Sequence, residues 1–147
     1  MREELVKNIA REIPGYTGYI DWKSDDEKVR KYVSDKLTRL RSILIQYTGS
    51  LPPDAIAFIN MAMSILDDIV EKLYRFKVDS GPEVDSLDRL IEIDHKLVEL
   101  IGHITKILNN VVSGVSIGLI REYSQLLYRL SLKLKRYVEE RMEILSI

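Results

Sequence analysis

Strong helix-breaking signals in this chain of 147 residues cluster in a few short runs. They are Pro14-Gly15 followed by Gly18, residues 49–53, residues 79–82, and Ser113-Gly114. Between these runs apolar residues recur three and four positions apart, which is the period of an amphipathic helix. We therefore predict a short helix over about 1–12, four long helices over about 24–48, 53–76, 82–112 and 116–145, and no strands.

The short connections between the predicted helices restrict their arrangement. A helix of about 25 to 30 residues is roughly 37 to 45 Å long, and connections of about four to eight residues cannot return along that length. Consecutive helices should therefore be antiparallel neighbours. We predict an all-α fold, an up-down-up-down four-helix bundle with a short additional N-terminal helix. It forms a single helical domain over 1–147, with the N-terminal helix and a Gly/Tyr/Trp loop in 1–23 and the bundle in 24–147.

The start of the first long helix carries a capping signal. Ser24 is followed three residues later by Glu27, the spacing of a capping box in which each side chain binds a free backbone amide. Asp25 and Asp26 add negative charge where the helix dipole is positive. We therefore predict that this helix begins at Ser24.

The composition excludes several classes of protein. The absence of cysteine excludes disulfides, thiolate nucleophiles and Cys-ligated metal sites. No apolar run approaches the roughly 20 residues that span a bilayer, and the charged first residues do not match a signal peptide. We expect a cytoplasmic protein without a membrane span. Two glutamines and four asparagines beside abundant charged residues are typical of a thermophile-like composition.

Glu92 and His95 have the Glu-x-x-His spacing found in di-iron carboxylate bundles. On a regular helix, however, both positions lie about 140° to 160° away from the centre of the apolar face. A second Glu-x-x-His pair is also required, and His103 lies on the same outer face. We therefore predict a solvated charged face rather than a metal site, with Glu92 and His95 as weak candidate ligands.

Arg89 and His95 allow a second chemical interpretation. An arginine followed four to six residues later by histidine resembles the motif of HEPN-type ribonucleases, which are also helical bundles. The resemblance covers these two residues and implies RNA cleavage or RNA binding. Leu90 stands where that family usually has a polar residue, and the two side chains would project about 120° apart on a regular helix.

No other motif in the sequence indicates catalysis. There is no glycine-rich phosphate loop, no Ser–His–Asp arrangement and no glycine-framed serine. We therefore expect no catalytic residues, no bound cofactor and, more generally, no enzyme.

Charge is distributed unevenly along the chain. Residues 23–41 carry a net charge of +3, residues 42–103 a net charge of −6, and residues 104–147 a net charge of +3. If the first and last long helices were neighbours, they would form a basic face beside an acidic one. The candidate residues of that basic face are Lys31, Arg39, Arg129, Lys133 and Arg136. Such a face could bind nucleic acid, but the overall charge of −1 favours association between copies of the chain.

The loop before the first long helix is rich in glycine and aromatic residues. It reads Ile-Pro-Gly-Tyr-Thr-Gly-Tyr-Ile-Asp-Trp over residues 13–22. It resembles the opening of a group of uncharacterised prokaryotic helical proteins that begin Ile-Pro-Gly-Tyr-x-Gly-Tyr and continue into a charged helix. The resemblance covers about 25 residues and implies helical content, with no established activity. Tyr16, Tyr19 and Trp22 either fasten the loop to the bundle or form a partner-binding site.

The apolar face of the third long helix suggests association. Its apolar positions span about 200° of the helix circumference, whereas a surface helix typically shows somewhat over 100°. They are Leu90, Ile93, Leu97, Leu100, Ile104 and Ile107. We therefore expect a non-catalytic interaction or scaffold protein that forms a homo-oligomer or binds a protein partner. Ribonuclease activity and electrostatic binding of nucleic acid are the alternatives.

Overall fold

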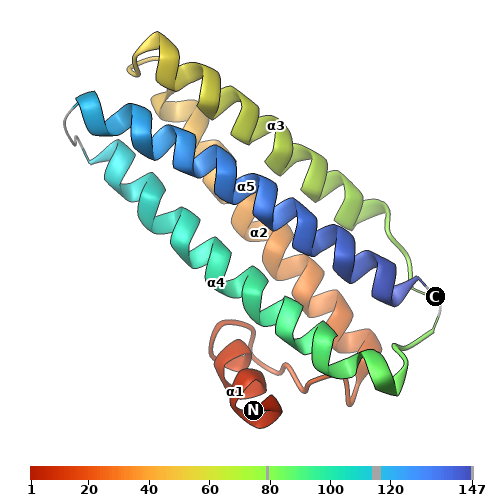
Figure 1. Cartoon of the computed structure of the whole chain (residues 1–147). Coiled ribbons are helices and arrows are strands. Elements are labelled where there is room, and N and C mark those ends of the chain that lie inside the picture. Colours follow the sequence, from red (N-terminus) through yellow and green to blue (C-terminus); the bar gives the residue numbers. More distant parts are fainter. Residues whose placement is uncertain (79, 114–116, 147) are drawn as a thin grey trace.

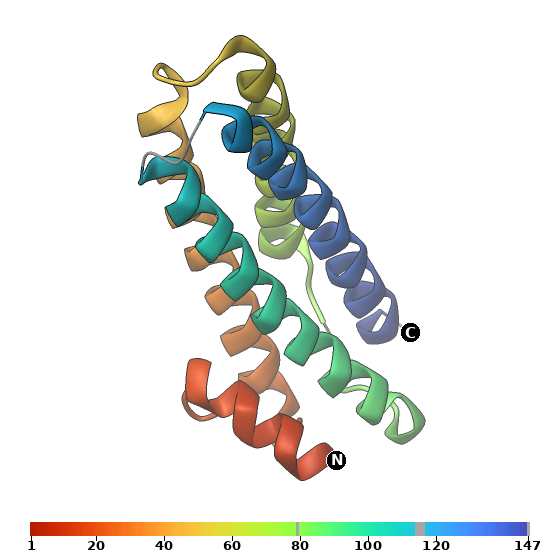
Figure 2. The ribbon, with the colours of Figure 1, turned by 60° about the vertical axis from the view of Figure 1, so that its left-hand side comes forward.

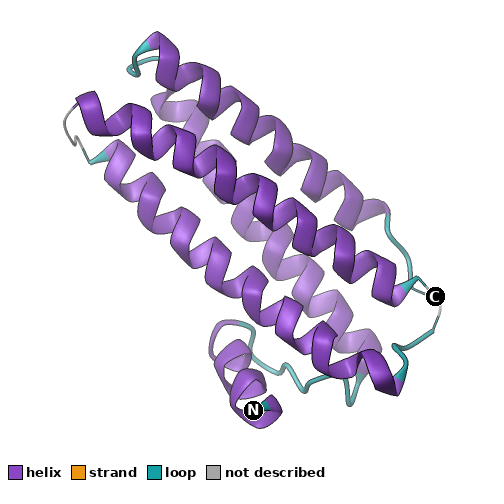
Figure 3. Ribbon diagram, viewed as in Figure 1, coloured by secondary structure: helices purple, strands orange, loops and turns teal. Residues whose placement is uncertain are grey.

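The computed structural model describes residues 1–78, 80–113 and 117–146, and every regular element in these ranges is helical (Figure 3). The helices are α1 (Arg2–Glu12), α2 (Trp22–Thr48), α3 (Pro53–Arg75), α4 (Leu87–Val112) and α5 (Ile117–Leu145), with a 3₁₀ turn η1 (Val84–Ser86) before α4. The all-α prediction is confirmed. None of the described helices combines the length and the apolar character needed to cross a bilayer.

The long helices pack in an order that differs from the sequence-based expectation. Helix α5 packs against α3 and α4, and α2 packs against the same two helices. In Figure 1, α5 lies in front and α2 behind, with α3 and α4 on either side, and Figure 2 shows the same order after rotation. The prediction that the first and last long helices are neighbours is therefore wrong, because α2 and α5 are diagonal. Helices α3 and α4 form the other diagonal, so the prediction that consecutive helices are neighbours fails for this pair.

Helix α1 packs against the first half of α4. Its Ile9 is completely buried, and the exposed Arg2 pairs with Asp88 at 2.6 Å. Beside the start of α2, Gly81 approaches the ring of Trp22 so closely that a Cβ at residue 81 would lie 2.7 Å from Trp22 Cδ1. The N-terminal segment and the connection from α3 to α4 therefore both close the same end of the bundle.

The wide apolar face of α4 is buried within a single chain. Its six predicted positions are all at most 7% exposed: Leu90, Ile93, Leu97, Leu100, Ile104 and Ile107. Helix α4 contacts α1, α2 and α5, so three neighbours cover an arc that one partner helix could not cover. This arc therefore provides no argument for a homo-oligomer.

The start of α2 also differs from the prediction. The helix begins at Trp22, and the carboxylate of Asp21 accepts a hydrogen bond from the backbone amide of Ser24 at 3.4 Å. Ser24 is therefore inside the first turn and does not cap the helix. Asp25 and Asp26 are 0% and 2% exposed, so they face the interior instead of the solvent.

Candidate functional site

The most concentrated polar chemistry of the described chain is a buried network around Asp94 of α4. Asp94 Oδ1 accepts a hydrogen bond from Arg141 Nε of α5 at 2.8 Å, and Asp94 Oδ2 accepts one from the Tyr16 hydroxyl at 2.8 Å. The Tyr19 hydroxyl donates to the same Oδ2 atom and accepts from Arg141 Nη2 at 3.0 Å. Asp94 is 0% exposed and Arg141 is 1% exposed.

Helix α2 completes this network from the opposite side of the bundle. Asp26 Oδ1 lies 2.9 Å from Arg141 Nη1, an ion pair in which the two atoms are not aligned as a hydrogen bond. Asp26 Oδ2 accepts from Arg30 Nε at 3.0 Å, and Arg30 Nη1 donates to the backbone carbonyl of Phe76 at 3.1 Å. Two carboxylates therefore face two guanidinium groups. The N-terminal loop, α4 and α5 are joined through charged hydrogen bonds, and the Asp26–Arg141 ion pair joins α2 to them.

The protonation states follow from burial and from the facing charges. Burial raises the pKa of Tyr16 and Tyr19 well above the ordinary value, so both hydroxyls stay protonated as donors. Burial also raises the pKa of Asp94, although Arg141 and the two hydroxyls oppose this shift. Burial acts to lower the pKa of Arg141. The electrostatic effects of Tyr19, Asp94 and Asp26 are together larger, so the pKa of Arg141 is well above its ordinary value. Arg141 therefore carries a buried positive charge.

A third buried carboxylate, Asp25, holds the loop that presents the two tyrosines. Its oxygens accept hydrogen bonds from the Thr17 amide at 3.0 and 3.1 Å, from the Thr17 hydroxyl at 2.6 Å and from the Tyr19 amide at 2.7 Å. Tyr19 has a φ of 73°, a left-handed conformation that bulky residues rarely adopt. These contacts offset the cost of that conformation and direct the Tyr19 ring into the core.

The two glycines of this loop should differ in their tolerance of substitution. Gly15 and Gly18 both have positive φ, so alanine is strained at either position. A Cβ at Gly18 would lie 2.9 Å from Cγ2 of Val6, a stiff β-branched side chain, whereas a Cβ at Gly15 would meet the flexible end of Lys28. We expect Gly18→Ala to lower the free energy of unfolding by about 2 kcal/mol and Gly15→Ala by about 1 kcal/mol. Urea unfolding of both variants measures this difference, and equal losses would contradict it.

Tyr16, Tyr19 and Trp22, the candidate partner-binding residues, fasten the loop to the bundle. Tyr16 and Tyr19 are 4% and 7% exposed, and their rings meet edge to face with centroids 5.8 Å apart. Trp22 is half-buried and packs against Gly81. The structure therefore supports the structural interpretation, because the two tyrosine rings are not available to a partner in this conformation.

Glu92 and His95, the weak candidate metal ligands, lie toward the outside of α4. The side chain of Glu92 is 50% exposed and pairs with Arg89, while His95 Nδ1 lies 3.0 Å from Glu99. Within the described residues no group of three or more acidic or histidine side chains is arranged to hold a metal ion. The geometry does not support a di-iron site at this pair.

Arg89 and His95, the candidate ribonuclease pair, have different partners. Arg89 forms a two-pronged contact with the Glu140 carboxylate of α5 at 2.5 and 2.7 Å, whereas His95 faces Glu99 on its own helix. The contact with Glu140 raises the pKa of Arg89 and lowers that of Glu140. The chain does not bring the two side chains onto a common partner, and ribonuclease activity stays a prediction.

The five residues of the predicted basic face lie on two separate helices. Lys31 and Arg39 are on α2, whereas Arg129, Lys133 and Arg136 are on α5. Because α2 and α5 are diagonal, these residues do not form the continuous surface that we expected. Lys31 also pairs with Asp35 at 2.8 Å. Lys133 and Arg136 of α5 instead line hollows together with residues of α4.

The seam between α3 and α5 has charged pairs at both of its ends. Arg121 Nε lies 3.5 Å from Asp54 at one end. At the other end Lys135 lies 3.1 Å from Asp68, and Lys72 lies 3.6 Å from Glu139. Because these pairs advance together along both sequences, α3 and α5 run parallel (Figure 1).

Between these charged ends the α3–α5 seam is apolar and partly exposed. The rings of Phe58 and Tyr128 lie 6.2 Å apart at their centroids. One helical turn further along lie Met61 and Leu132, which are 41% and 39% exposed, with the half-buried Ile65 beside them. The seam therefore has the composition of a protein contact, with apolar residues in the middle and charged pairs at the rim.

Comparison of the chain with protein-family models, with curated proteins and with solved structures found no match. The proposals below therefore depend on the contacts, charges and exposure of the residues of this chain.

The residues of the buried network were not predicted from the sequence. Asp25 and Asp26 were interpreted as helix-end charges, and neither Asp94 nor Arg141 was a candidate site residue. One signal was available, because Asp94 immediately follows Ile93 and precedes Leu97, and so lies within the apolar arc of its helix. A charged residue in such an arc indicates a buried partner of opposite charge.

Proposed function

We propose that this protein is a non-catalytic helical interaction module that self-associates through the α3–α5 seam. The observation that carries the proposal is the exposed apolar centre of this seam, where Met61 and Leu132 are 41% and 39% exposed beside Phe58 and Tyr128. The buried Asp94 network supports a non-catalytic role, since its charges are partnered with one another and sealed from solvent. Such a network stabilises one arrangement of the helices.

The charged ends of the seam favour a second copy of the chain as the partner. A two-fold axis through the apolar centre would turn the second copy end for end. Helix α3 of one copy would then lie antiparallel on α3 of the other, and α5 on α5. Asp54 of one copy would face Lys72 of the other, and Arg121 would face Glu139. Both ends therefore meet groups of opposite charge in a closed dimer.

The dimensions of the seam set the expected strength of association. From residue 54 to residue 72 the seam is about 27 Å long, and two helices side by side are about 20 Å wide. This surface is at the lower end of stable protein interfaces, which bury about 800 Å² on each partner. We therefore expect a dimer with a dissociation constant in the micromolar range.

Sedimentation of the whole chain between about 1 and 100 µM tests this proposal. We expect a monomer–dimer equilibrium for the unaltered chain and a monomer for the double variant Met61→Glu/Leu132→Glu, because four glutamates would meet in the contact. Ile45→Glu is the matched control, since Ile45 is a 50% exposed apolar residue on α2, diagonal to α5.

Two outcomes would contradict the proposal. A monomer for the unaltered chain at every concentration would rule out self-association. Dissociation by Ile45→Glu as strongly as by the seam variant would place the contact elsewhere. Circular dichroism of each variant confirms that the exposed substitutions leave the fold intact.

We regard residues 1–147 as one domain, an up-and-down four-helix bundle with α1 packed against it. The chain acts in the cytoplasm and needs no cofactor. The Ile-Pro-Gly-Tyr-x-Gly-Tyr resemblance suggests that the proteins sharing it use the loop in the same way, as an attachment of the N-terminal segment to a buried carboxylate.

A further inference from the structure

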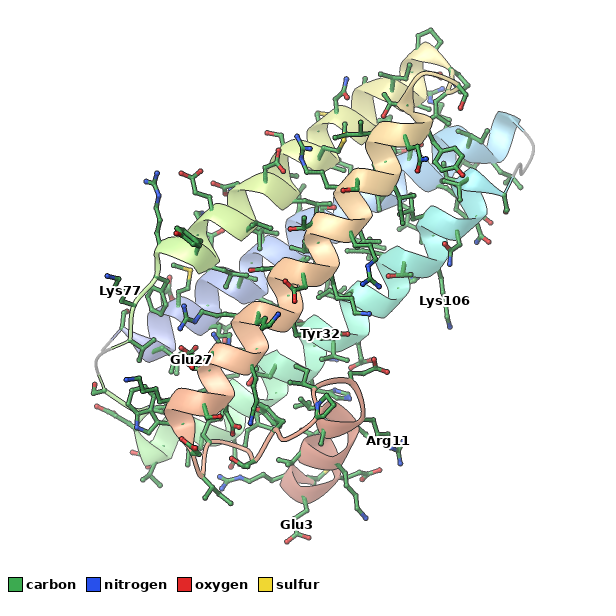
Figure 4. The ribbon with its side chains drawn as sticks, turned by 180° about the vertical axis from the view of Figure 1, so that it is seen from behind. Glu3, Arg11, Glu27, Tyr32, Lys77 and Lys106 are labelled. Atoms are coloured by element: carbon green, nitrogen blue, oxygen red, sulfur yellow. The ribbon has the colours of Figure 1, made fainter. Side chains whose placement is uncertain are left out.

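A groove between α4 and α5 gathers basic side chains on a face other than the α3–α5 seam. Its volume is about 450 Å³, and Lys96, His103, Lys106, Lys133 and Tyr137 are among its lining residues. Figure 4 shows the Lys106 side chain projecting outward from α4. A second hollow of about 210 Å³, which Arg89, Arg136 and Glu140 line, shares Lys133 and Tyr137 with the first, so the two are continuous.

The charge of this groove is opposite to that of the chain. Its lining holds five cations, Lys96, Lys106, Lys133, Arg89 and Arg136, against two carboxylates, Glu99 and Glu140. Five positive and two negative charges leave +3 on a chain whose net charge is −1. A concave surface of one sign concentrates ligands of the other sign.

Several of these cations have no internal carboxylate partner. Among the described residues, Lys106, Lys133 and Arg136 form no ion pair, and Lys96 lies 3.9 Å from a Glu99 carboxylate that His95 also contacts. The neighbouring Lys135 and Arg121 of the same helix are paired with Asp68 and Asp54. The free positive charge of α5 is therefore directed toward the groove rather than toward α3.

The groove also contains an aromatic surface, the ring of Tyr137. Tyr137 is half-buried and lines both hollows, and it immediately follows Arg136 in the sequence, four positions after Lys133. Gly102 faces open space, since no atom outside its own turn lies within 4 Å of where its Cβ would be. A ligand can therefore reach the backbone of α4 at this point, with the Tyr137 ring on the other wall.

We propose that the α4–α5 groove binds single-stranded nucleic acid. Lys96, Lys106, Lys133 and Arg136 contact consecutive phosphates, and a base stacks on Tyr137. Positive charge combined with an aromatic platform is the arrangement that holds single strands without sequence preference. The stretch of α4 from Arg89 to Lys106 is about 25 Å long, which gives room for several nucleotides. This function is independent of self-association through the α3–α5 seam.

Fluorescence anisotropy with labelled U20 and dT20 strands tests the phosphate contacts. If the groove neutralises about four phosphates, a plot of the logarithm of the association constant against the logarithm of the salt concentration should have a slope of about −2.8. Binding should therefore weaken about 50-fold between 50 and 200 mM salt. The double variant Lys106→Gln/Lys133→Gln should bind at least about tenfold more weakly and halve that slope.

Lys7→Gln/Lys77→Gln is the matched control for net charge. Lys7 and Lys77 are exposed, and Figure 4 shows Lys77 far from Lys106. This control should keep the affinity and salt slope of the unaltered chain. The seam variant Met61→Glu/Leu132→Glu should bind the strands with a dissociation constant per chain within about threefold of that of the unaltered chain, a difference that its added negative charge accounts for. The binding test therefore does not depend on whether the chain forms a dimer.

Stacking on Tyr137 is tested with a ligand that has phosphates and no bases. Tyr137→Leu should weaken oligonucleotide binding about tenfold. The affinity of inorganic polyphosphate, measured by competition with the labelled strand, should stay unchanged. Three results would overturn the proposal: no binding of either strand at 50 mM salt, equal weakening by the control lysine pair, or no effect of Tyr137→Leu on either strand. The last result would make the groove a general polyanion site.

Discussion

Replacing Asp94 by alanine should lower the free energy of unfolding by about 3–5 kcal/mol. The substitution leaves the buried charge of Arg141 with Asp26 alone, because Asp94 Oδ1 is the acceptor for Arg141 Nε at 2.8 Å. It also removes the acceptor of the Tyr16 and Tyr19 hydroxyls. A buried guanidinium that has lost one of its two carboxylates and two unpaired hydroxyl donors in the core all raise the free energy of the folded state.

Urea unfolding of Asp94→Ala and of the control Glu92→Ala measures this loss. Glu92 lies on the same helix with a 50% exposed side chain, so its removal should change stability by less than about 0.5 kcal/mol. The double variant Asp94→Leu/Arg141→Met should recover much of the loss, because it removes both charges together. Equal stability of Asp94→Ala and the unaltered chain would contradict the assigned network.

Replacing Asp25 by alanine should lower the free energy of unfolding by about 2–4 kcal/mol. Asp25 accepts three hydrogen bonds within the loop from the amides of Thr17 and Tyr19 and from the Thr17 hydroxyl, and it is completely buried. Without these bonds, the loop loses the backbone contacts that offset the cost of the positive φ of Tyr19. The loss should therefore be greatest where the loop joins the bundle.

Hydrogen exchange distinguishes this local effect from general destabilisation. We expect amides in residues 2–19 to lose protection first in Asp25→Ala, while those in the middle of α4 and α5 lose protection by no more than the global change. Asp35→Ala is the control, because the side chain of Asp35 is 65% exposed on the same helix. Uniform loss of protection along the chain in Asp25→Ala would contradict a role in holding the loop.

Local sequence signals determined the helices. The glycine and proline runs mark where an α-helix cannot continue, so α3 begins at Pro53 and α2 ends at Thr48 as predicted. The period of the apolar residues identified the buried face of α4 because that period depends on helix geometry alone. These features require no knowledge of which helix lies next to which.

The choice of neighbours depended on tertiary structure. An up-and-down chain can place α5 beside α2 or diagonal to it, and the second arrangement makes α3 and α4 the other diagonal pair. The connection between α3 and α4 is longer than those on either side of it, which allows this arrangement without requiring it. The structure places α5 between α3 and α4, which separates Lys31 and Arg39 from Arg129, Lys133 and Arg136. It also directs the cations of α5 into the groove beside α4.

The role of each charged residue depended on tertiary structure for the same reason. Asp25 and Glu27 lie two positions apart at one helix end, yet Asp25 is completely buried and Glu27 is exposed. Arg141 reaches Asp94 from 47 positions away and Asp26 from the opposite helix. Helical propensity and apolar period act over a few residues and are visible in the sequence, whereas the pairing of buried charges requires the packed positions of four separate segments.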